Sequence, residues 1–290
     1  MLASVKALLS GIVDYAGLFP PAKLSLPEAI ANYAQYHQEP NNWMLGRFIL
    51  PIAKLSDFQG LITKITLPKW NLSLILSQDW QRDLEQVEFL KNPALAVNSL
   101  EFPVLEVKEI YSVLKALPEG IETFFEIPLH EDRKPYLQVL SDRGVCAKIR
   151  TGGMNEAAFP NPLHLSECLL ALGKAQLAFK ATAGLHHPLP GWHQISHEVN
   201  SPITQMHGFL NLAILAALIY HRKIIFSEVV EVLQTSNFQF NEDGINWSNC
   251  QLSITELEVS RDRFFRSFGS CSFREPVEDL KELQLINRPS

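Results

Sequence analysis

The stretch AQLAFKATAGLHH, residues 175–187, does most to decide the fold. Its apolar run ends at Lys180, and small residues, a glycine and the pair His186 and His187 follow. An apolar run bounded by turn-forming residues predicts a buried strand that opens into a tight loop. Lys180 then stands where the strand leaves the core, and a lysine in a partly desolvated site can lose its proton and act as a nucleophile or a base.

Residues 145–153, VCAKIRTGG, repeat this plan one unit upstream. Lys148 and Arg150 are two residues apart, so on a strand their side chains point to the same side. The guanidinium of Arg150 suits a carboxylate or a phosphate, because it can donate two parallel hydrogen bonds. Gly152 and Gly153 would supply backbone amides to such a ligand. The two strand ends together predict a pocket for a small anionic metabolite.

Strands and helices alternate through the first two thirds of the chain. Apolar runs predict strands at residues 47–50, 72–76, 95–102, 123–127, 144–149 and 177–182. Amphipathic spacing predicts helices at residues 25–36, 56–66, 79–90, 105–117, 133–141 and 162–172. This alternation is typical of parallel strands joined by helical crossovers. Because neither a Gly-x-Gly-x-x-Gly nor a Walker motif occurs, the pattern favours an α/β fold of the (β/α) TIM-barrel type, complete or irregular.

One domain is predicted for residues 1–290, with a decorated and mostly helical C-terminal third. Its expected parts are an N-terminal helix and loop within 1–40, β/α repeats over 41–190 and a helical completion over 191–290. Six strands are predicted, whereas a closed TIM barrel has eight. The hypothesis for the missing pair is residues 208–212 and a hairpin within 238–247, where Glu242-Asp243-Gly244 signals a turn.

The proline-rich stretch DYAGLFPPA, residues 14–22, is interpreted as a fixed loop. It either covers the barrel and presents Asp14 to the site or plugs the structure with Phe19.

Charged side chains recur where the expected strands end. In parallel barrels, functional side chains gather at that end of the strands. The alternative without a functional site is that the charges mark the points at which strands reach solvent. However, burying unpaired charges inside apolar strands costs folding free energy. The candidate site residues are Arg47, Glu101, Glu126, Lys148, Arg150, Gly152, Gly153, Lys180, His186 and His187.

The leading hypothesis gives Lys180 the role of nucleophile or base. Lys148 and Arg150 would lower its pKa and anchor the anion, and Glu126 would carry protons. His186 or His187 would assist, because histidine titrates near neutral pH.

Residues 148–153 and 179–184 resemble class I aldolases of the deoxyribose-phosphate aldolase type, which place lysines on late barrel strands before loops of small residues. The resemblance implies a lyase that forms a Schiff base with a small carbonyl compound.

Two other function classes stay open. A divalent-metal-dependent hydrolase or isomerase would use Glu101, Glu126 and histidines such as His193 and His197, whose i, i+4 spacing suits a metal on a helix. A barrel without catalysis would bind a ligand or a partner protein. No cofactor is predicted under the leading hypothesis.

The composition limits the class of protein, the partners and the compartment that the sequence predicts. The chain is 47% apolar and 19% charged, as in ordered globular proteins, and its net charge of −6 argues against a nucleic-acid partner. The four cysteines form no CxxC pair, which predicts reduced thiols and a cytoplasmic location. Residues 2–13 follow helical spacing rather than a signal-peptide pattern, and the apolar run 208–220 is too short to cross a membrane. A homo-oligomer is compatible with all of this.

Overall fold

The computed structural model describes residues 1–65, 67–129, 132–196, 198 and 200–287. Within these ranges, eight parallel strands close into a barrel in the order β1-β13-β7-β6-β5-β4-β3-β2. The strands are β1 Val13–Tyr15, β2 Leu45–Pro51, β3 Trp70–Ile75, β4 Leu95–Phe102, β5 Glu122–Glu126, β6 Cys146–Arg150, β7 Phe179–Thr182 and β13 Phe265–Ser270. The predicted TIM barrel is therefore confirmed, and it is closed.

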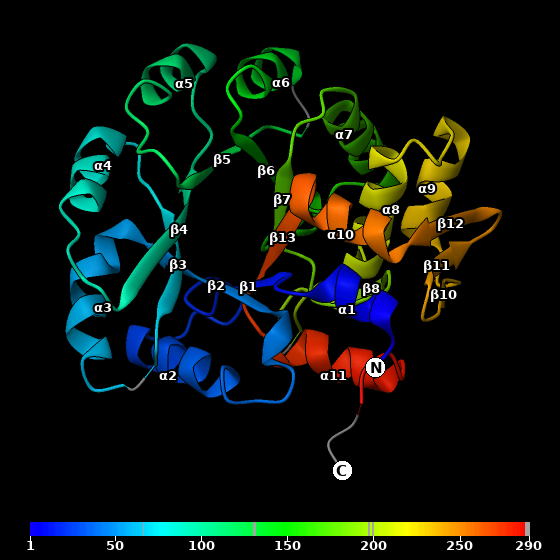
Figure 1. The fold of residues 1–290 in the computed structure, drawn as a ribbon, viewed down its shortest axis with the longest axis horizontal. Coiled ribbons are helices and arrows are strands. Elements are labelled where there is room, and N and C mark those ends of the chain that lie inside the picture. The colour runs from blue at the N-terminus through cyan, green and yellow to red at the C-terminus, as the bar shows by residue number, and fades with distance from the viewer. Residues whose placement is uncertain (66, 130–131, 197, 199, 288–290) are drawn as a thin grey trace.

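Helices surround the strands of the barrel (Figure 1). They are α1 Ala3–Leu9, α2 Leu26–Tyr36, α3 Leu55–Ile62, α4 Trp80–Glu88, α5 Val107–Val113, α6 Lys134–Ser141, α7 Pro162–Lys174 and α11 Arg274–Glu282, with short 3-10 turns at Asn42–Met44, Ile52–Lys54 and Glu156–Ala158. Local sequence sets where they begin. Ser25 caps α2 in a capping box with Glu28, whose carboxylate accepts the Ser25 backbone N–H at 2.9 Å.

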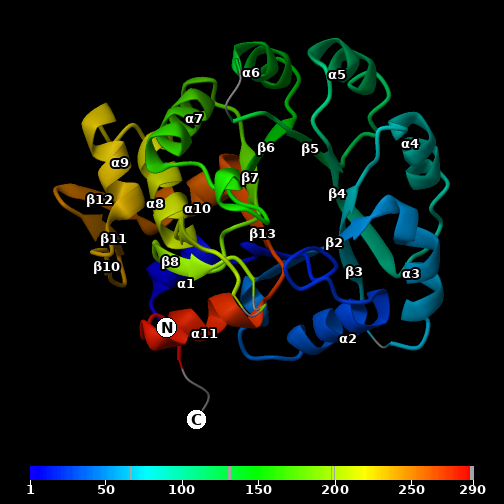
Figure 2. The same cartoon turned by 180° about the vertical axis from the view of Figure 1, so that it is seen from behind.

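A long excursion separates β7 from β13. It contains the antiparallel hairpin β8 Gly191–Gln194 and β9 Ile203–Met206, helices α8 Phe209–Tyr220, α9 Phe226–Gln234 and α10 Ile254–Arg263, and the small sheet β10 Gln239–Phe240, β11 Gly244–Trp247 and β12 Cys250–Ser253. Figures 1 and 2 show α8, α9 and this sheet as a lobe on one side of the barrel. Among the described residues, no helix has the length and apolar character needed to cross a bilayer.

The hypothesis for the last two barrel strands is wrong. Residues 209–212 belong to α8, and the hairpin around Gly244 belongs to the separate small sheet. The missing strands are β1 and β13, and α1 ends at Leu9 rather than continuing through residue 13. Both strands lack an apolar run, because their inward positions carry polar groups such as Asp14 and Ser267.

The loops after β6 and β7 touch at two glycines, Gly152 and Gly184. Gly184 has φ +73°, and a Cβ there would lie 2.8 Å from the Gly152 Cα. The Thr151 hydroxyl donates to the Ala183 carbonyl at 2.6 Å and fixes this contact. The small residues that follow both strands therefore allow the barrel rim to close tightly at this point.

We predict that Gly184→Ala destabilises the protein more than Gly120→Ala does. Both glycines have positive φ, +73° and +77°, so both substitutions carry a cost of about 1 kcal/mol. Nothing lies within 4 Å of a Cβ at Gly120. Overpacking therefore adds about 1–3 kcal/mol at Gly184 alone. Urea unfolding of both variants measures the difference, and equal losses would contradict the close contact.

Candidate functional site

Six charged side chains of alternating sign run through the barrel interior toward its C-terminal mouth. We call them the charge chain. In order of contact they are Asp14 on β1, Lys180 on β7, Glu101 on β4, Lys148 on β6, Glu126 on β5 and Arg150 on β6. Five of the strands that form the barrel thus contribute to one continuous set of ion pairs.

The inner end of the charge chain centres on Lys180. Its Nζ lies 2.5 Å from Asp14 Oδ2 and 2.7 Å from Glu101 Oε1, and its side chain has no solvent exposure. Serine hydroxyls complete the shell: Ser267 donates to Asp14 and Ser73 donates to Glu101, each at 2.6 Å. Such hydrogen bonds offset the large cost of removing these charges from water.

The outer end reaches solvent. Lys148 Nζ lies 3.3 Å from Glu101 Oε2 and 3.1 Å from Glu126 Oε2, and Arg150 Nε donates to Glu126 Oε1 at 2.9 Å. Side-chain exposure rises from 4% at Lys148 to 14% at Glu126 and 50% at Arg150. The two cations of β6 are therefore the part of the charge chain that faces the mouth.

Strand register explains why these residues meet. Glu126 pairs with Lys148 across β5 and β6, and Lys148 pairs with Lys180 across β6 and β7. Directly paired residues of parallel strands point to the same side, and here that side is the barrel interior. Lys148, Arg150 and Lys180 therefore all face the barrel interior, and Lys148 and Arg150 also line the cavity at its mouth.

The charged groups in the barrel interior shift one another's pKa values. Burial alone would lower the pKa of Lys180, but Asp14 and Glu101 outweigh it and raise that pKa above its ordinary value. Burial alone would raise the pKa of Glu101, but Lys180 and Lys148 outweigh it and lower that pKa to about 2. The pKa of Lys180 is therefore raised rather than lowered as expected, because the carboxylates of Asp14 and Glu101 contact its ammonium directly and outweigh the effect of nearby cations.

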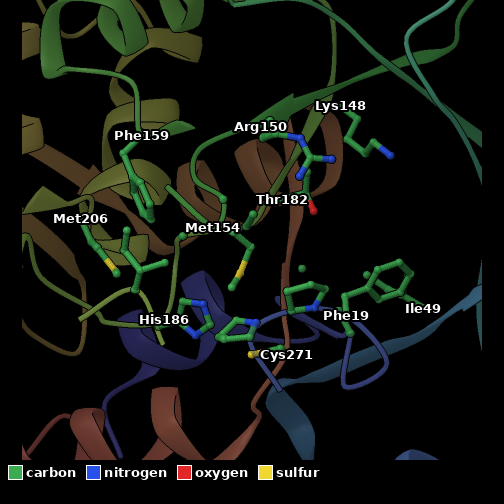
Figure 3. A pocket seen from close by; sticks show the side chains of 18 of the residues that line it. Phe19, Ile49, Lys148, Arg150, Met154, Phe159, Thr182, His186, Met206 and Cys271 are labelled. Carbon is green, nitrogen blue, oxygen red and sulfur yellow. The ribbon is translucent and has the colours of Figure 1, made fainter. Parts of the chain in front are cut away.

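A cavity of about 230 Å³ lies over the barrel mouth (Figure 3). Glu101, Lys148, Arg150 and Thr182 form its polar side. Its apolar walls are Phe19, Pro20, Pro21, Ile49, Ile75, Met154, Phe159, Ile195 and Met206. Among the residues described around this cavity, Lys148 supplies an amine to the lining, whereas Lys180 lies behind it.

Arg47 does not belong to the mouth. It is the third residue of β2, and its Nη2 lies 2.5 Å from Glu122 Oε2, at the start of β5. Arg266 also pairs with Glu122, at 2.9 Å. The Phe124 ring contacts both cations: its centroid lies 5.8 Å from Arg47 Cζ and 5.3 Å from Lys180 Nζ. Arg47 therefore belongs to a second ion cluster toward the N-terminal end of the strands.

The two predicted histidines diverge. His186 lines the cavity, and its Nδ1 lies 3.0 Å from Glu275 on α11. His187 instead pairs with Asp279 at 2.7 Å, and its ring stacks on His193. Of the two glycines, Gly153 lines the cavity, whereas Gly152 packs on Gly184.

The described side chains do not form a ligand set for the alternative of a divalent-metal enzyme. His197 lies outside the described residues, while His193 lies on β8 rather than on a helix. Among the described residues, no group of three or more His, Cys, Asp or Glu side chains is arranged to hold a metal ion. The divalent-metal enzyme stays a prediction without support from side-chain placement.

Sequence reasoning placed Asp14 at the site as one of two alternatives, but on a loop rather than on a buried strand. The stretch 14–22 was expected to be a loop, but Asp14 and Tyr15 lie in β1, and Asp14 is buried. The available signal was an acidic residue directly after the apolar pair Ile12 and Val13. The rest of the stretch does reach the mouth, where Phe19 lines the cavity.

The fold and the charge chain define a (β/α)8 barrel with a polar interior that opens into an enclosed cavity. Comparison of the chain with protein-family models, with curated proteins and with solved structures gives no significant match. The resemblance to class I aldolases therefore rests on the residues of this chain alone.

We predict that Lys180→Met lowers the free energy of unfolding by about 3–5 kcal/mol, because it removes the cation that pairs with buried Asp14 and leaves Glu101 with Lys148 alone. Urea denaturation measures the loss. Lys108→Met is the matched control, since the Lys108 side chain is 83% exposed and should leave stability nearly unchanged. A similar result for both variants would contradict the buried ion pairs.

We also predict a pH signature of Glu101. Its lowered pKa means that its ionisation stabilises the fold above about pH 4.5, and this contribution is lost as the pH falls through about 2. The shift corresponds to about 3 kcal/mol at neutral pH. The stability difference between the wild type and Glu101→Gln should therefore shrink between pH 6 and pH 2 in urea titrations. A constant difference would show that Glu101 does not titrate as the geometry implies.

Proposed function

We propose that this protein is a lyase of aldolase type in which Lys148 forms a Schiff base with a small carbonyl compound. The observation that carries the proposal is the position of the Lys148 amine, at the cavity wall and between the carboxylates of Glu101 and Glu126. Carbonyl chemistry needs an amine that the substrate can reach and a base beside it.

Glu126 supports the required proton transfer. Burial alone would raise its pKa, but Lys148 and Arg150 outweigh it and hold the pKa below its usual value. Glu126 is therefore ionised at neutral pH and, at 3.1 Å, accepts the proton that Lys148 must lose. The free amine then attacks the carbonyl carbon, and the proton held by Glu126 passes to the former carbonyl oxygen, which leaves as water as the C=N bond forms.

Charge balance favours Lys148 for this role. A protonated Schiff base carries the same positive charge as the ammonium it replaces, so it restores the ion pairs with Glu101 and Glu126 once the C=N bond has formed. The iminium withdraws electrons and lets a nearby carbon–carbon bond break, with the electron pair held as an enamine.

Lys180 fits a positioning role better than the nucleophilic role first expected. Its ammonium is enclosed, its pKa is raised, and two carboxylates bind it. A lysine in that state holds Glu101 in place and neutralises Asp14.

We also propose that the protein is located in the cytoplasm. The cysteines Cys146, Cys168, Cys250 and Cys271 are all free thiols in the structure, which suits a reducing compartment.

We predict that borohydride traps an adduct on Lys148. The protein is incubated with small aldehydes and ketones, reduced with sodium cyanoborohydride, and analysed by intact and peptide mass spectrometry. Lys148→Arg should abolish the adduct while retaining the positive charge and the folded circular dichroism spectrum. Lys108→Arg, which changes an exposed lysine, should leave the adduct in place.

Two results would overturn the assignment. An adduct that maps to Lys180 would return the nucleophile to the inner lysine. Failure of every carbonyl to give an adduct, in a protein that still binds small acids, would favour a barrel that binds without catalysis.

A further inference from the structure

We infer that the substrate is a 2-oxo acid with an apolar branched or aromatic substituent. The inference deepens the proposed function and rests on it. It follows from three features of the mouth: the cation that ends the charge chain, the spacing of Lys148 and Arg150, and the apolar walls.

The charge chain ends on a cation. Arg150 gives its Nε and Nη2 hydrogen bonds to Glu126, and its side chain is 50% exposed at the cavity. A guanidinium carries five N–H donors, so these two bonds leave donors for a second partner. The group that continues the alternation of charge is an anion, and a planar carboxylate matches the guanidinium fork.

The spacing on β6 places carbonyl and carboxylate side by side. Lys148 and Arg150 are two residues apart on one strand, with Cα atoms about 7 Å apart on the same side. Lys148 forms the covalent bond to the carbonyl carbon, and Arg150 donates a hydrogen bond to the carboxylate. A compound whose carboxylate is bonded directly to its carbonyl carbon spans this gap without an intervening chain.

A phosphate fits this rim less well. A phosphate would need the backbone amides of the loop after β6 to be open, as glycine-rich anion loops are. One side of Gly152 is filled, since a Cβ there would lie 2.6 Å from the Gly184 Cα and 2.7 Å from the Phe159 ring. The loop is used for packing rather than left as an open cradle.

The rest of the cavity is largely apolar, and the imidazole of His186, which also lines it, is already paired with Glu275. Figure 3 shows Met154, Phe159 and Met206 to one side of Arg150, with Phe19 and Ile49 on another. Burying an apolar substituent against these side chains is favourable, whereas a second carboxylate placed there would lose water without gaining a cation. A substituent larger than methyl is needed to reach them.

Isothermal titration of the wild type tests this choice. We expect 4-methyl-2-oxopentanoate to bind about tenfold or more tightly than pyruvate, because three further carbons become buried. The same compound should also bind more tightly than 2-oxoglutarate, whose second carboxylate has no partner, and than the neutral ketone 4-methyl-2-pentanone. Equal affinity for pyruvate or 2-oxoglutarate would overturn the inference.

Two variants locate the contacts. Arg150→Gln should weaken 4-methyl-2-oxopentanoate binding about tenfold, through loss of a charged hydrogen bond. Arg143→Gln is the matched control, since Arg143 is exposed and precedes β6 at the opposite end of that strand. Ile75→Ala should reduce the preference for the branched acid over pyruvate, because Ile75 lines the cavity. Unchanged binding in Arg150→Gln would refute the carboxylate site.

The 2-hydroxy acid separates this inference from the proposed function. 2-Hydroxy-4-methylpentanoate has the same carboxylate and substituent but no carbonyl, so it binds without forming a Schiff base. Tight binding of this acid, together with no trapped adduct from 4-methyl-2-oxopentanoate, would support the ligand class and refute the lyase. Trapped adducts on Lys148 without preference among the acids would support the lyase and refute the ligand class.

Discussion

The barrel interior is organised by one ammonium group, that of Lys180, held between the carboxylates of Asp14 and Glu101. These residues come from β7, β1 and β4, so the ion pairs tie together strands from the beginning, middle and end of the barrel. A buried charge is tolerable only when it is paired and hydrogen-bonded. The serines on β3 and β13 that donate to the carboxylates are part of the same requirement.

The need to pair buried charges also determines which charged groups can reach a ligand. Because Lys180 neutralises part of the charge on Glu101, the second Glu101 oxygen can hold Lys148, and Lys148 in turn meets Glu126. Exposure increases along this sequence toward Arg150. The inner members fix the geometry, and the outer members are within reach of a ligand. Apolar segments outside the β/α repeats, such as the loop with Phe19 and the β8–β9 hairpin with Met206, then enclose the cavity.

Strands with continuous apolar runs were predictable from the sequence, as Phe48, Ile49 and Leu50 of β2 illustrate, because burial on both faces of a parallel sheet leaves a local pattern. Strands β1 and β13 were not, because β1 is three residues long with Asp14 at its centre and β13 reads FRSFGS. Their inward polar residues are stabilised by partners far away in the chain. A local pattern of hydrophobicity carries no record of such partners.

The candidate site divides in the same way. The sequence by itself determined the barrel class, the presence of lysines on two late strands and the shared side of Lys148 and Arg150, since strand periodicity is a local property. Only the tertiary structure decided which lysine borders the cavity and which is enclosed. Closure of the barrel brings Asp14 to Lys180, and the ionisation of a buried group depends on the charges within a few ångströms of it, whatever their distance along the chain.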